Sequence, residues 1–357
     1  MSKVVHNGSR YMRFIKLLLA LVLIGGSAIF FVTRDTSPEA NAISIIKSHG
    51  GELVRENGFP DSPLVRIVFN SNRNPLSDPR SRSGLRPATP SGLIESVKAI
   101  HNLTQIHTLT GLNFLNADVS NDVLKEVGEL NHLTSLVFNG NNVTDAGIYH
   151  LYNLKNLSHL SVHCKYVSDN GMKNIGIFKN LTSLDLSGTQ VSDGTLKEVR
   201  QLENLTSLDL DRTQITDEGL KFVAEIKTLK RISLNNTNVS GAGIKELRNL
   251  KGMTSLSIGQ ASITNEGLKE LIELQNLEKL QVNQTNISDD GLTEIGKLEN
   301  LTLLNLNKTK VTGAGLVKLK SLKQLKLLFL SDISPTDAGV TELKRSLPNL
   351  DVQFLGQ

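Results

Sequence analysis

The side chains best suited to chemistry gather between positions 159 and 231 of this 357-residue chain. They are His159, His163, Cys164, Asp185, Asp209, Asp211, Arg212 and Arg231. Imidazole, thiolate and carboxylate groups are the usual ligands of zinc, so His163, Cys164 and Asp211 could hold a metal. His163 and an aspartate beside Ser187 could also supply the base and the orienting carboxylate of a serine hydrolase. A third possibility is a charged surface for a partner. The positions of these residues on strands and turns distinguish the three kinds of site.

A 24-residue repeat carries these residues. The stretch from Leu181 to Asn204 (LTSLDLSGTQVSDGTLKEVRQLEN) is followed by another 24 residues with the same apolar positions. Its leading position recurs ten times without slippage, at Leu109, Leu133, Leu157, Leu181, Leu205, Leu229, Met253, Leu277, Leu301 and Leu325. A fixed period in the range of about 20–29 residues that opens L-x-x-L-x-L is typical of a leucine-rich repeat.

Each repeat predicts a strand, a turn and a helix. Leucines stand on either side of Asp185, so the leucines face inward and the aspartate faces solvent. The helix start is clearest at 216–220 (TDEGL), where Thr216 can cap the helix and Asp217 lies near the positive end of its dipole. One strand and one short helix cannot bury their own apolar faces, so neighbouring repeats must stack into a solenoid.

The repeats resemble leucine-rich repeat proteins with a T-D-x-G-L helix start, which are common in bacteria, notably those of the planctomycete type. The same pattern occurs in the repeat arrays of eukaryotic F-box substrate receptors. The resemblance covers residues 91–357. It implies an α/β solenoid of about ten repeats, with a parallel β-sheet on the concave face and helices on the convex face. It also implies a scaffold that binds a partner, without saying which, because such arrays are reused for unrelated functions.

On such a sheet the solvent-facing strand positions form rows across neighbouring repeats. Strands lie about 4.8 Å apart, so Asp185 and Asp209 should be lateral neighbours, with Asp211 near both. His163 and Asp211 should lie about 10 Å apart at Cα, and Cys164 should point away from His163, which disfavours a compact zinc site. Ser187 lacks the elbow and pocket of a hydrolase, and an open sheet excludes no water. We therefore predict no metal, no cofactor and no catalytic residue.

A charged patch for a partner is the interpretation that we favour. Its candidate residues are His159, His163, Asp185, Asp209, Asp211, Arg212 and Arg231. We expect this patch to contact an unknown protein or polymer through the concave face. The alternative is a solvated face without a partner, in which Arg212 and Arg231 offset the repulsion between the aspartates.

The charges are divided unevenly along the chain. Residues 1–90 hold 12 Lys or Arg and 6 Asp or Glu, whereas residues 91–357 hold 27 and 29. The repeats are therefore near neutral and lack the basic face that nucleic-acid binding requires, so no nucleic-acid partner is predicted. Cys164 is the only cysteine, which excludes an intrachain disulfide.

The N-terminal segment predicts a membrane anchor. Residues 1–13 form a basic tail. Residues 14–33 are just long enough to span a membrane core of about 30 Å if Lys16 reaches the headgroups. Positive charge before this segment places the N-terminus in the cytoplasm and the repeats on the periplasmic or extracellular side of a single-pass membrane protein. Cleavage as a signal peptide after Ala42 is the alternative.

The segments that flank the repeats depart from the pattern. Residues 37–69 predict a capping helix, with Ser37 as N-cap, followed by two short strands. Residues 70–90 are rich in proline, arginine and serine and predict a loop. The repeat domain spans residues 91–357, and its last part, 333–357, predicts a C-terminal cap that ends in a strand.

The sequence thus predicts a solenoid on a membrane anchor that acts as a non-enzymatic binding or scaffold protein outside the cytoplasmic membrane. An F-box-like substrate-recognition subunit of a ubiquitin ligase is the alternative, although no helical F-box segment precedes the repeats. The frequent Asn-x-Ser/Thr sequons follow from the repeat itself, so we interpret their asparagines as structural.

Overall fold

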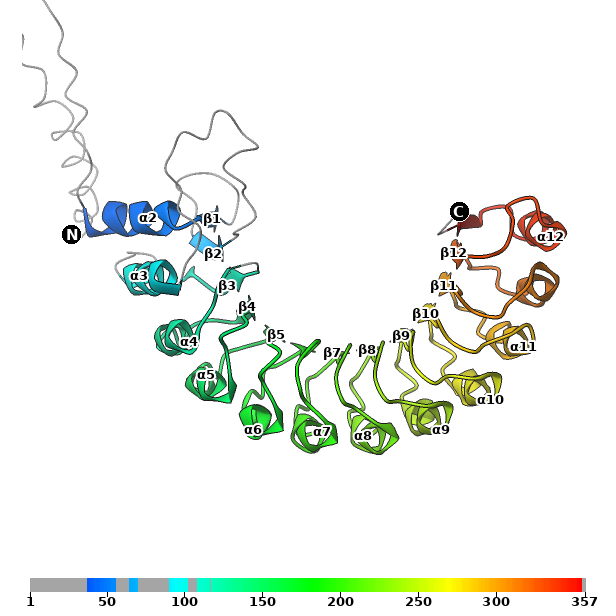
Figure 1. Ribbon diagram of the computed structural model, residues 1–357, viewed down its shortest axis with the longest axis horizontal. Coiled ribbons are helices and arrows are strands. Elements are labelled where there is room, and N and C mark those ends of the chain that lie inside the picture. Colours follow the sequence, from blue (N-terminus) through cyan, green and yellow to red (C-terminus); the bar gives the residue numbers. More distant parts are fainter. Residues whose placement is uncertain (1–36, 56–63, 70–89, 102–107, 116, 355–357) are drawn as a thin grey trace, which may run out of the picture.

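The coils of the repeat stack side by side along a curved arc (Figure 1). The structure is a computed structural model, and it describes residues 37–55, 64–69, 90–101, 108–115 and 117–354. The strands lie on the inner, concave side of the arc and the helices on the outer, convex side. Stacking is required because each coil can bury its apolar side only against the next one.

The described strands form one thirteen-stranded sheet whose spatial order follows chain order. They are β1 (Gly51–Arg55), β2 (Leu64–Phe69), β3 (Gly111–Phe114), β4 (Ser135–Asn139), β5 (His159–His163), β6 (Ser183–Asp185), β7 (Ser207–Asp209), β8 (Arg231–Ser233), β9 (Ser255–Ser257), β10 (Lys279–Gln281), β11 (Leu303–Asn305), β12 (Leu327–Leu330) and β13 (Asp351–Phe354). From β2 onward the pairs are parallel and equivalent residues lie opposite each other, as Leu184 does to Leu208. The predicted parallel pairing is confirmed for the strands of the repeats, and β1, in the predicted cap, is antiparallel to β2. The link between them, residues 56–63, is shorter than the dozen or so residues that a parallel crossover needs.

The convex helices are short. The α-helices are α2 (Pro38–Ser48), α3 (Pro90–Ile100), α4 (Asn121–Val127), α5 (Asp145–Tyr149), α6 (Asp169–Met172), α7 (Asp193–Val199), α8 (Asp217–Val223), α9 (Gly241–Ile244), α10 (Asn265–Leu268), α11 (Gly291–Ile295) and α12 (Ala338–Ser346). The 3-10 helices are η2 (His150–Asn153), η3 (Ile175–Ile177), η4 (Lys245–Asn249), η5 (Lys269–Glu273) and η6 (Gly313–Leu319). Each 24-residue coil must also hold a strand and two turns, so only one or two helical turns fit on its outer side. The longer helices α2, α3 and α12 lie toward the two ends of the array.

The apolar positions of the repeat build one continuous core. In the coil that begins at Leu181, the side chains of Leu184, Leu186 and Leu196 are at most 1% exposed. Their equivalents in the next coil, among them Leu210, are buried as well. The predicted inward phase of the strand leucines is therefore confirmed, and it leaves the residues between them to face the concavity.

A ladder of side-chain hydrogen bonds explains the T-D-x-G part of the repeat. Asp193 accepts hydrogen bonds from the N–H and the hydroxyl of Thr216 in the next coil, at 2.9 and 2.6 Å. Gly219 leaves room for this carboxylate, because a Cβ there would lie 2.3 Å from its Oδ1. We call the residues that make this contact the helix-start ladder: Asp145, Asp169, Asp193, Asp217 and Asp289, with Asn121 and Asn265 in two of the coils.

The helix starts combine two kinds of contact. Thr216 caps its own helix as predicted, because its Oγ1 accepts a hydrogen bond from the N–H of Glu218 at 3.3 Å. Asp217 does more than complement a helix dipole. Its carboxylate accepts hydrogen bonds from the N–H and the hydroxyl of Ser240, at 2.7 and 2.6 Å. The aspartate therefore ties one coil to the next.

The asparagines of the sequons hold the turn that precedes each strand. The Nδ2 groups of Asn180, Asn204 and Asn300 donate to main-chain carbonyls of the preceding coil, at 3.3, 2.9 and 2.8 Å. An N-linked glycan would attach to this same nitrogen. The contacts thus support the structural interpretation of these asparagines.

The two ends of the solenoid carry elements outside the regular repeat. At the N-terminal end, the Ser37 Oγ accepts a hydrogen bond from the N–H of Ala40 at 3.1 Å and caps α2. At the other end, α12 and β13 close the array. Among the described residues no helix is both long and apolar enough to cross a membrane. The predicted tail (1–13), anchor (14–33) and most of the predicted loop (70–89) lie outside those residues.

Candidate functional site

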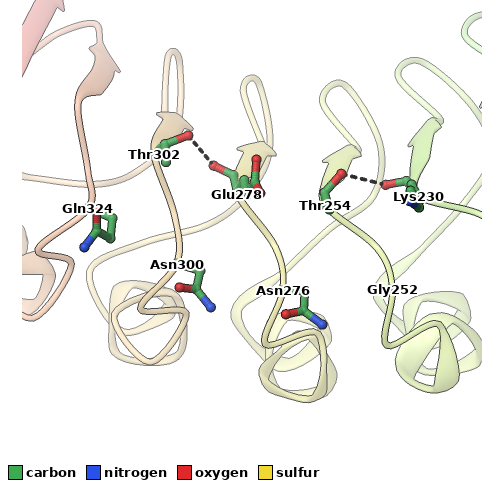
Figure 2. A pocket seen from close by; sticks show the side chains of 8 residues that line it. All are labelled: Lys230, Gly252, Thr254, Asn276, Glu278, Asn300, Thr302 and Gln324. Atoms are coloured by element: carbon green, nitrogen blue, oxygen red, sulfur yellow. Dashed lines mark hydrogen bonds between the residues drawn. The ribbon is translucent and has the colours of Figure 1, made fainter.

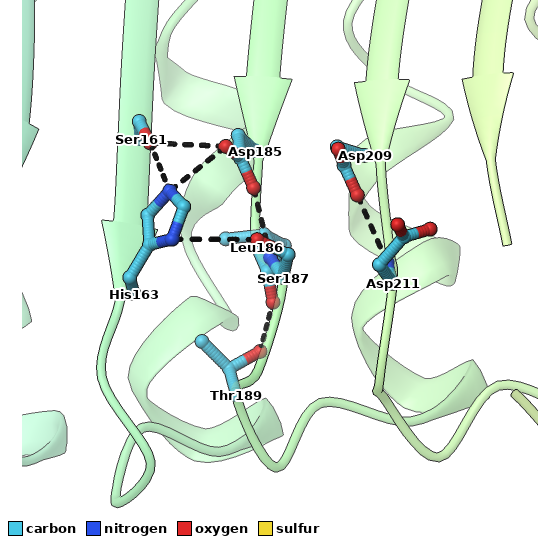
Figure 3. A network of polar contacts seen from close by, with 8 residues as sticks. All are labelled: Ser161, His163, Asp185, Leu186, Ser187, Thr189, Asp209 and Asp211. Carbon is cyan, nitrogen blue, oxygen red and sulfur yellow. Dashed lines mark hydrogen bonds and ion pairs between the residues drawn. The ribbon is translucent and has the colours of Figure 1, made fainter. Parts of the chain in front are cut away.

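A cluster of polar side chains lies on the concave face at the ends of β5, β6 and β7. Residues between the buried leucines of these strands point away from the helices. We call the following residues the concave cluster: Ser161, His163, Asp185, Ser187, Asp209 and Asp211 (Figure 3). Parallel pairing brings them together, because it places Asp185 opposite Ser161 on one side and Asp209 on the other.

His163 and Asp185 form the centre of the concave cluster. The Nε2 atom of His163 lies 2.9 Å from Oδ2 of Asp185, and the two side chains are 33% and 29% exposed. The Ser161 Oγ lies 2.7 Å from the same nitrogen and 3.1 Å from the same oxygen. On the other side of the ring, the Ser187 Oγ lies 3.4 Å from Nδ1. The His163 ring is thus held by three side chains from two neighbouring coils.

This contact changes the protonation of both partners. The hydrogen bond with Asp185 raises the pKa of His163 above its usual value, although burial opposes the shift. For Asp185, burial alone would raise the pKa, but the hydrogen bonds from His163 and from the N–H of Ser187 lower it on balance. Both shifts favour an imidazolium paired with a carboxylate.

Asp209 has no such partner in the part of the chain that the structure describes. Its Oδ1 accepts a hydrogen bond from the N–H of Asp211 at 2.9 Å. Burial, together with the negative charges of Asp211 and Asp185, raises the pKa of Asp209 to about 6. At neutral pH the fold therefore holds an ionised carboxylate that its surroundings disfavour.

Asp211 is held by the next coil. Its Oδ1 accepts hydrogen bonds from the hydroxyl of Ser233 at 2.6 Å and from the N–H of Asn235 at 2.8 Å, and its Oδ2 accepts one from the Asn235 amide at 3.0 Å. Sequence reasoning missed the roles of Ser161, Ser233 and Asn235, because these residues carry no charge. They occupy the same strand rows as the predicted residues, one repeat away. That position could have identified them as neighbours of the predicted aspartates.

Three predicted residues lie outside the concave cluster. His159 begins β5, where its Nδ1 lies 2.8 Å from the hydroxyl of the preceding serine. Arg231 begins β8, and its Nε donates to Ser207 Oγ at 3.4 Å. Arg212 lies in the turn after β7 with φ near +56°. Among the described residues no salt bridge joins either arginine to these aspartates, and the ion pair that forms uses His163 instead.

The geometry also bears on the metal and hydrolase alternatives. Among the described residues no group of three or more His, Cys, Asp or Glu could hold a metal ion. Cys164 faces the core, where burial raises the pKa of its thiol to about 12. Ser187 does lie against His163, but it is only 5% exposed and its N–H donates to Asp185 Oδ1 at 2.9 Å. This serine therefore lacks the access that a nucleophile needs, and its N–H is not free to stabilise an oxyanion.

A shallow groove of about 560 Å³ lies along one lateral edge, between the helix ends and the strand starts (Figure 2). Its lining residues are Lys230, Gly252, Thr254, Asn276, Glu278, Asn300, Thr302 and Gln324. The Asn276 amide donates to the carbonyl of Lys251 at 2.8 Å, and the Thr302 hydroxyl to that of Glu278 at 3.0 Å. Because these polar groups join neighbouring coils, the groove has a structural explanation and the concave cluster is the stronger candidate site.

Comparisons with known proteins agree with this architecture. A family model described as Leucine Rich repeat matches residues 129–151, 179–197, 201–224 and 273–296. The crystal structure of an internalin (inlF) from Listeria monocytogenes is similar, with a TM-score of 0.56 and 25% identity over 77% of this chain and 79% of that chain. An internalin C2 (inlC2) from the same species gives a TM-score of 0.45 and 24% identity over 59% and 84%. No curated protein matches the sequence. The chain thus has the α/β fold of a leucine-rich repeat solenoid and resembles a bacterial internalin.

Proposed function

We propose that the solenoid is a non-enzymatic binding protein whose concave cluster contacts a basic segment of a partner protein or polymer. The state of Asp209 carries this proposal. Its pKa of about 6 means that the carboxylate is ionised at neutral pH beside Asp185 and Asp211, with a main-chain N–H as its hydrogen-bond donor. A lysine or arginine side chain of a partner would supply the counter-charge that the fold leaves out.

The form of the surface suits such a partner. Solenoids present an extended concave wall, and binding to that wall needs no enclosed pocket. The strand positions beyond Asp209 are occupied by Ser233 and Ser257 in the neighbouring coils, which add no competing charge. Charge complementarity of this kind acts mainly on association rate and specificity.

The test is the triple substitution Asp185→Asn, Asp209→Asn and Asp211→Asn. Affinity capture with the full chain identifies the partner, and association is then measured at low and at physiological salt. We expect the triple variant to bind at least about tenfold more weakly at low salt, mainly through slower association, with a smaller difference as salt rises. Thermal unfolding of the triple variant is measured first, because Asp185 and Asp211 also accept hydrogen bonds within the fold while the substitutions relieve repulsion.

A matched control removes three negative charges from the convex face. Glu218→Gln, Glu246→Gln and Glu266→Gln remove the same total charge from exposed or half-buried positions on the convex helices. This variant should bind as the unsubstituted chain does. Equal affinity of the triple aspartate variant and the unsubstituted chain at low salt would place the binding site on another face.

We also propose that residues 14–33 anchor the chain in a membrane, with the solenoid on the periplasmic or extracellular side. This proposal rests on the basic tail and the apolar run of the sequence. The protein should fractionate with membranes and resist carbonate extraction, and protease outside the inner membrane should digest the repeats. A soluble mature form that begins at Ile43 would contradict the anchor and support cleavage.

The likeness to a bacterial internalin supports the bacterial type of repeat protein. The finer resemblance to planctomycete-type membrane-anchored proteins stays a proposal on the sequence pattern. No observation favours the F-box-like alternative.

A further inference from the structure

Three side-chain contacts recur from coil to coil and brace the solenoid outside its sheet. The first is the helix-start ladder. The second is a threonine hydroxyl that donates to the carbonyl three residues earlier, at Thr189, Thr213, Thr237, Thr285 and Thr309. The third is an asparagine amide that donates to the preceding coil, at Asn156, Asn180, Asn204, Asn276 and Asn300.

The coil that spans residues 240–263 supplies none of the three. Gly241 stands at the ladder position, Gly252 at the asparagine position and Ala261 at the threonine position. The following coil, 264–287, supplies all three. The preceding coil, 216–239, supplies two, and there Thr228 replaces the asparagine by donating to the Leu205 carbonyl at 2.7 Å. The loss is therefore concentrated in one interior coil.

Each junction of this coil has lost one contact. Towards the preceding coil, Gly252 offers no amide, and open space surrounds the position where its Cβ would be. Towards the following coil, Gly241 lies directly against Gly267, because a Cβ on Gly267 would be 2.5 Å from the Gly241 Cα. The bonds that remain there include Lys251–Glu273 at 2.6 Å, whose side chains are 54% and 55% exposed. Exposed pairs of this kind contribute little to stability.

The helices on either side of this junction are short. α9 and α10 have four residues each and continue as the 3-10 helices η4 and η5. By contrast, α7 and α8 have seven residues each. α5 and α6 also continue as 3-10 helices, but their coils keep the ladder contact. Hydrogen-bond geometry is poorer in 3-10 helices than in α-helices, so at α9 and α10 the short helices and the missing ladder contact weaken the same junction.

The sheet stays intact across the same coil. β9 pairs in register with β8 and with β10, so Leu256 lies between Ile232 and Leu280. The convex side can therefore open or close while the sheet stays paired, and the coils would then bend about β9 on the concave face.

We propose that residues 240–263 form a hinge at which the solenoid changes its curvature. The hinge separates the coils of the concave cluster from a concave half rich in amides, where Gln281, Asn283 and Asn305 face outward between the buried strand residues. Opening of the convex side at α9 and α10 would change the angle between these two surfaces. The hinge exists whether or not the concave cluster binds a partner.

One other described coil, 312–335, lacks the same three residue types, with Gly313, Gln324 and Ile333 in their places. It adjoins the C-terminal cap, and Asp337 of that cap lies against Gly313, where a Cβ would clash with its carboxylate. A coil at the end of an array has no second array to move. The interior coil is therefore the one that can change the shape of the whole solenoid.

The test is amide hydrogen exchange of the full chain, followed coil by coil. Amides of 240–263 should exchange about tenfold faster than those of 192–215 and 264–287, because the missing contacts make local opening easier there. Interior coils of equal stability would exchange at equal rates. Equal exchange across these three coils would overturn the hinge.

Two variants sharpen the test. Gly252→Asn with Ala261→Thr restores two of the missing contacts, and Gly252 has room for the new side chain. Exchange in 240–263 should then slow by at least about threefold, toward the level of the neighbours, because Gly241 still leaves the ladder contact unmade. The reverse change, Asn276→Gly, should speed exchange in 264–287. If the restored variant exchanges as the unsubstituted chain does, the missing contacts are not the cause and the proposal fails.

Discussion

Asp169 of the helix-start ladder and Asp209 of the concave cluster share a residue type and have opposite environments. In the helix-start ladder, Asp169 accepts hydrogen bonds from the N–H and hydroxyl groups of Ser192 and of Thr195. Burial alone would raise the pKa of Asp169, but these bonds lower it on balance. In the concave cluster, Asp209 accepts a bond from one main-chain N–H, and burial and neighbouring charges raise its pKa to about 6.

The difference separates structural from functional carboxylates. The ladder residue recurs at a fixed position, so the fold surrounds it with donors in coil after coil. Asp209 stands at a position where six of the nine other repeats carry Ser, Gln or Asn, and the fold gains no stability from its charge. A side chain that costs stability and has no place in the repeat is the better candidate for binding, and substitutions can break or sharpen this contrast.

The largest change in stability should come from a carboxylate placed in the core, where no group can donate a hydrogen bond to it. Leu210 is fully buried, and Leu210→Asp would place a charge in the core, at a cost of about 3 kcal/mol or more of unfolding free energy. Ser207→Asp, on the open strand face beside Arg231, should change stability by no more than about 0.5 kcal/mol. Chemical denaturation of both variants measures the difference. Similar stabilities would mean that inside and outside are assigned wrongly.

The next effect tests the ladder. Asp169→Ala leaves the N–H and hydroxyl groups of Ser192 and Thr195 without their acceptor and should cost about 2–3 kcal/mol. Asp122→Ala, at an exposed first-turn position that is not part of the ladder, should cost about 0.5 kcal/mol or less. Urea unfolding measures both. A loss at Asp169 no larger than that at Asp122 would show that the ladder contributes nothing to stability.

A smaller effect should appear as pH dependence. Because the pKa of Asp209 is raised from 3.8 to about 6, the folded state binds more protons than the unfolded state in that window, and stability falls as pH rises through it. His163 acts in the same direction at higher pH, since stability from its raised pKa is present below 6.5 and lost as pH rises through the folded value.

Asp169 and Asp185, with lowered pKa values, act below pH 3.8, where stability is lost as pH falls. Unfolding free energies at pH 4.5, 6 and 8 should therefore decrease by about 1–2 kcal/mol in total, after allowance for solvent screening. The double variant Asp209→Asn with His163→Gln should show a flatter profile. A profile as steep as that of the unsubstituted chain would assign the effect to other groups.

The repeat pattern made much of the fold and part of the site predictable. The strict 24-residue period gave the strand rows, so the lateral placement of Asp185 beside Asp209 followed from the sequence. The partner of Asp185 did not follow from the sequence, because His163 contacts it diagonally from the adjacent strand and this contact depends on the side-chain rotamer. The sequence also gave no reason to expect that Asp217 bonds to the next coil, since that contact forms only when coils stack.

The departures from the repeat were the least predictable. In the sequence, Gly241, Gly252 and Ala261 look like ordinary variation at the polar positions of the repeat. Their common effect appears only when the contacts of the neighbouring coils are compared. Likewise, the antiparallel pairing of β1 depends on a short connection that the repeat does not describe.

The most direct test of this account is the thermal unfolding of Asp209→Asn and Asp169→Asn, compared with the unsubstituted chain at pH 7.5. Both substitutions remove one negative charge and keep the shape of the side chain. Asp209→Asn should raise the stability by about 1 kcal/mol, because the charged form is disfavoured there, and Asp169→Asn should lower it by a similar amount. Shifts of opposite sign would support the distinction between Asp209 and the ladder aspartates. A loss of stability in both variants would show that Asp209 is a structural residue like those of the ladder, and would contradict the central claim.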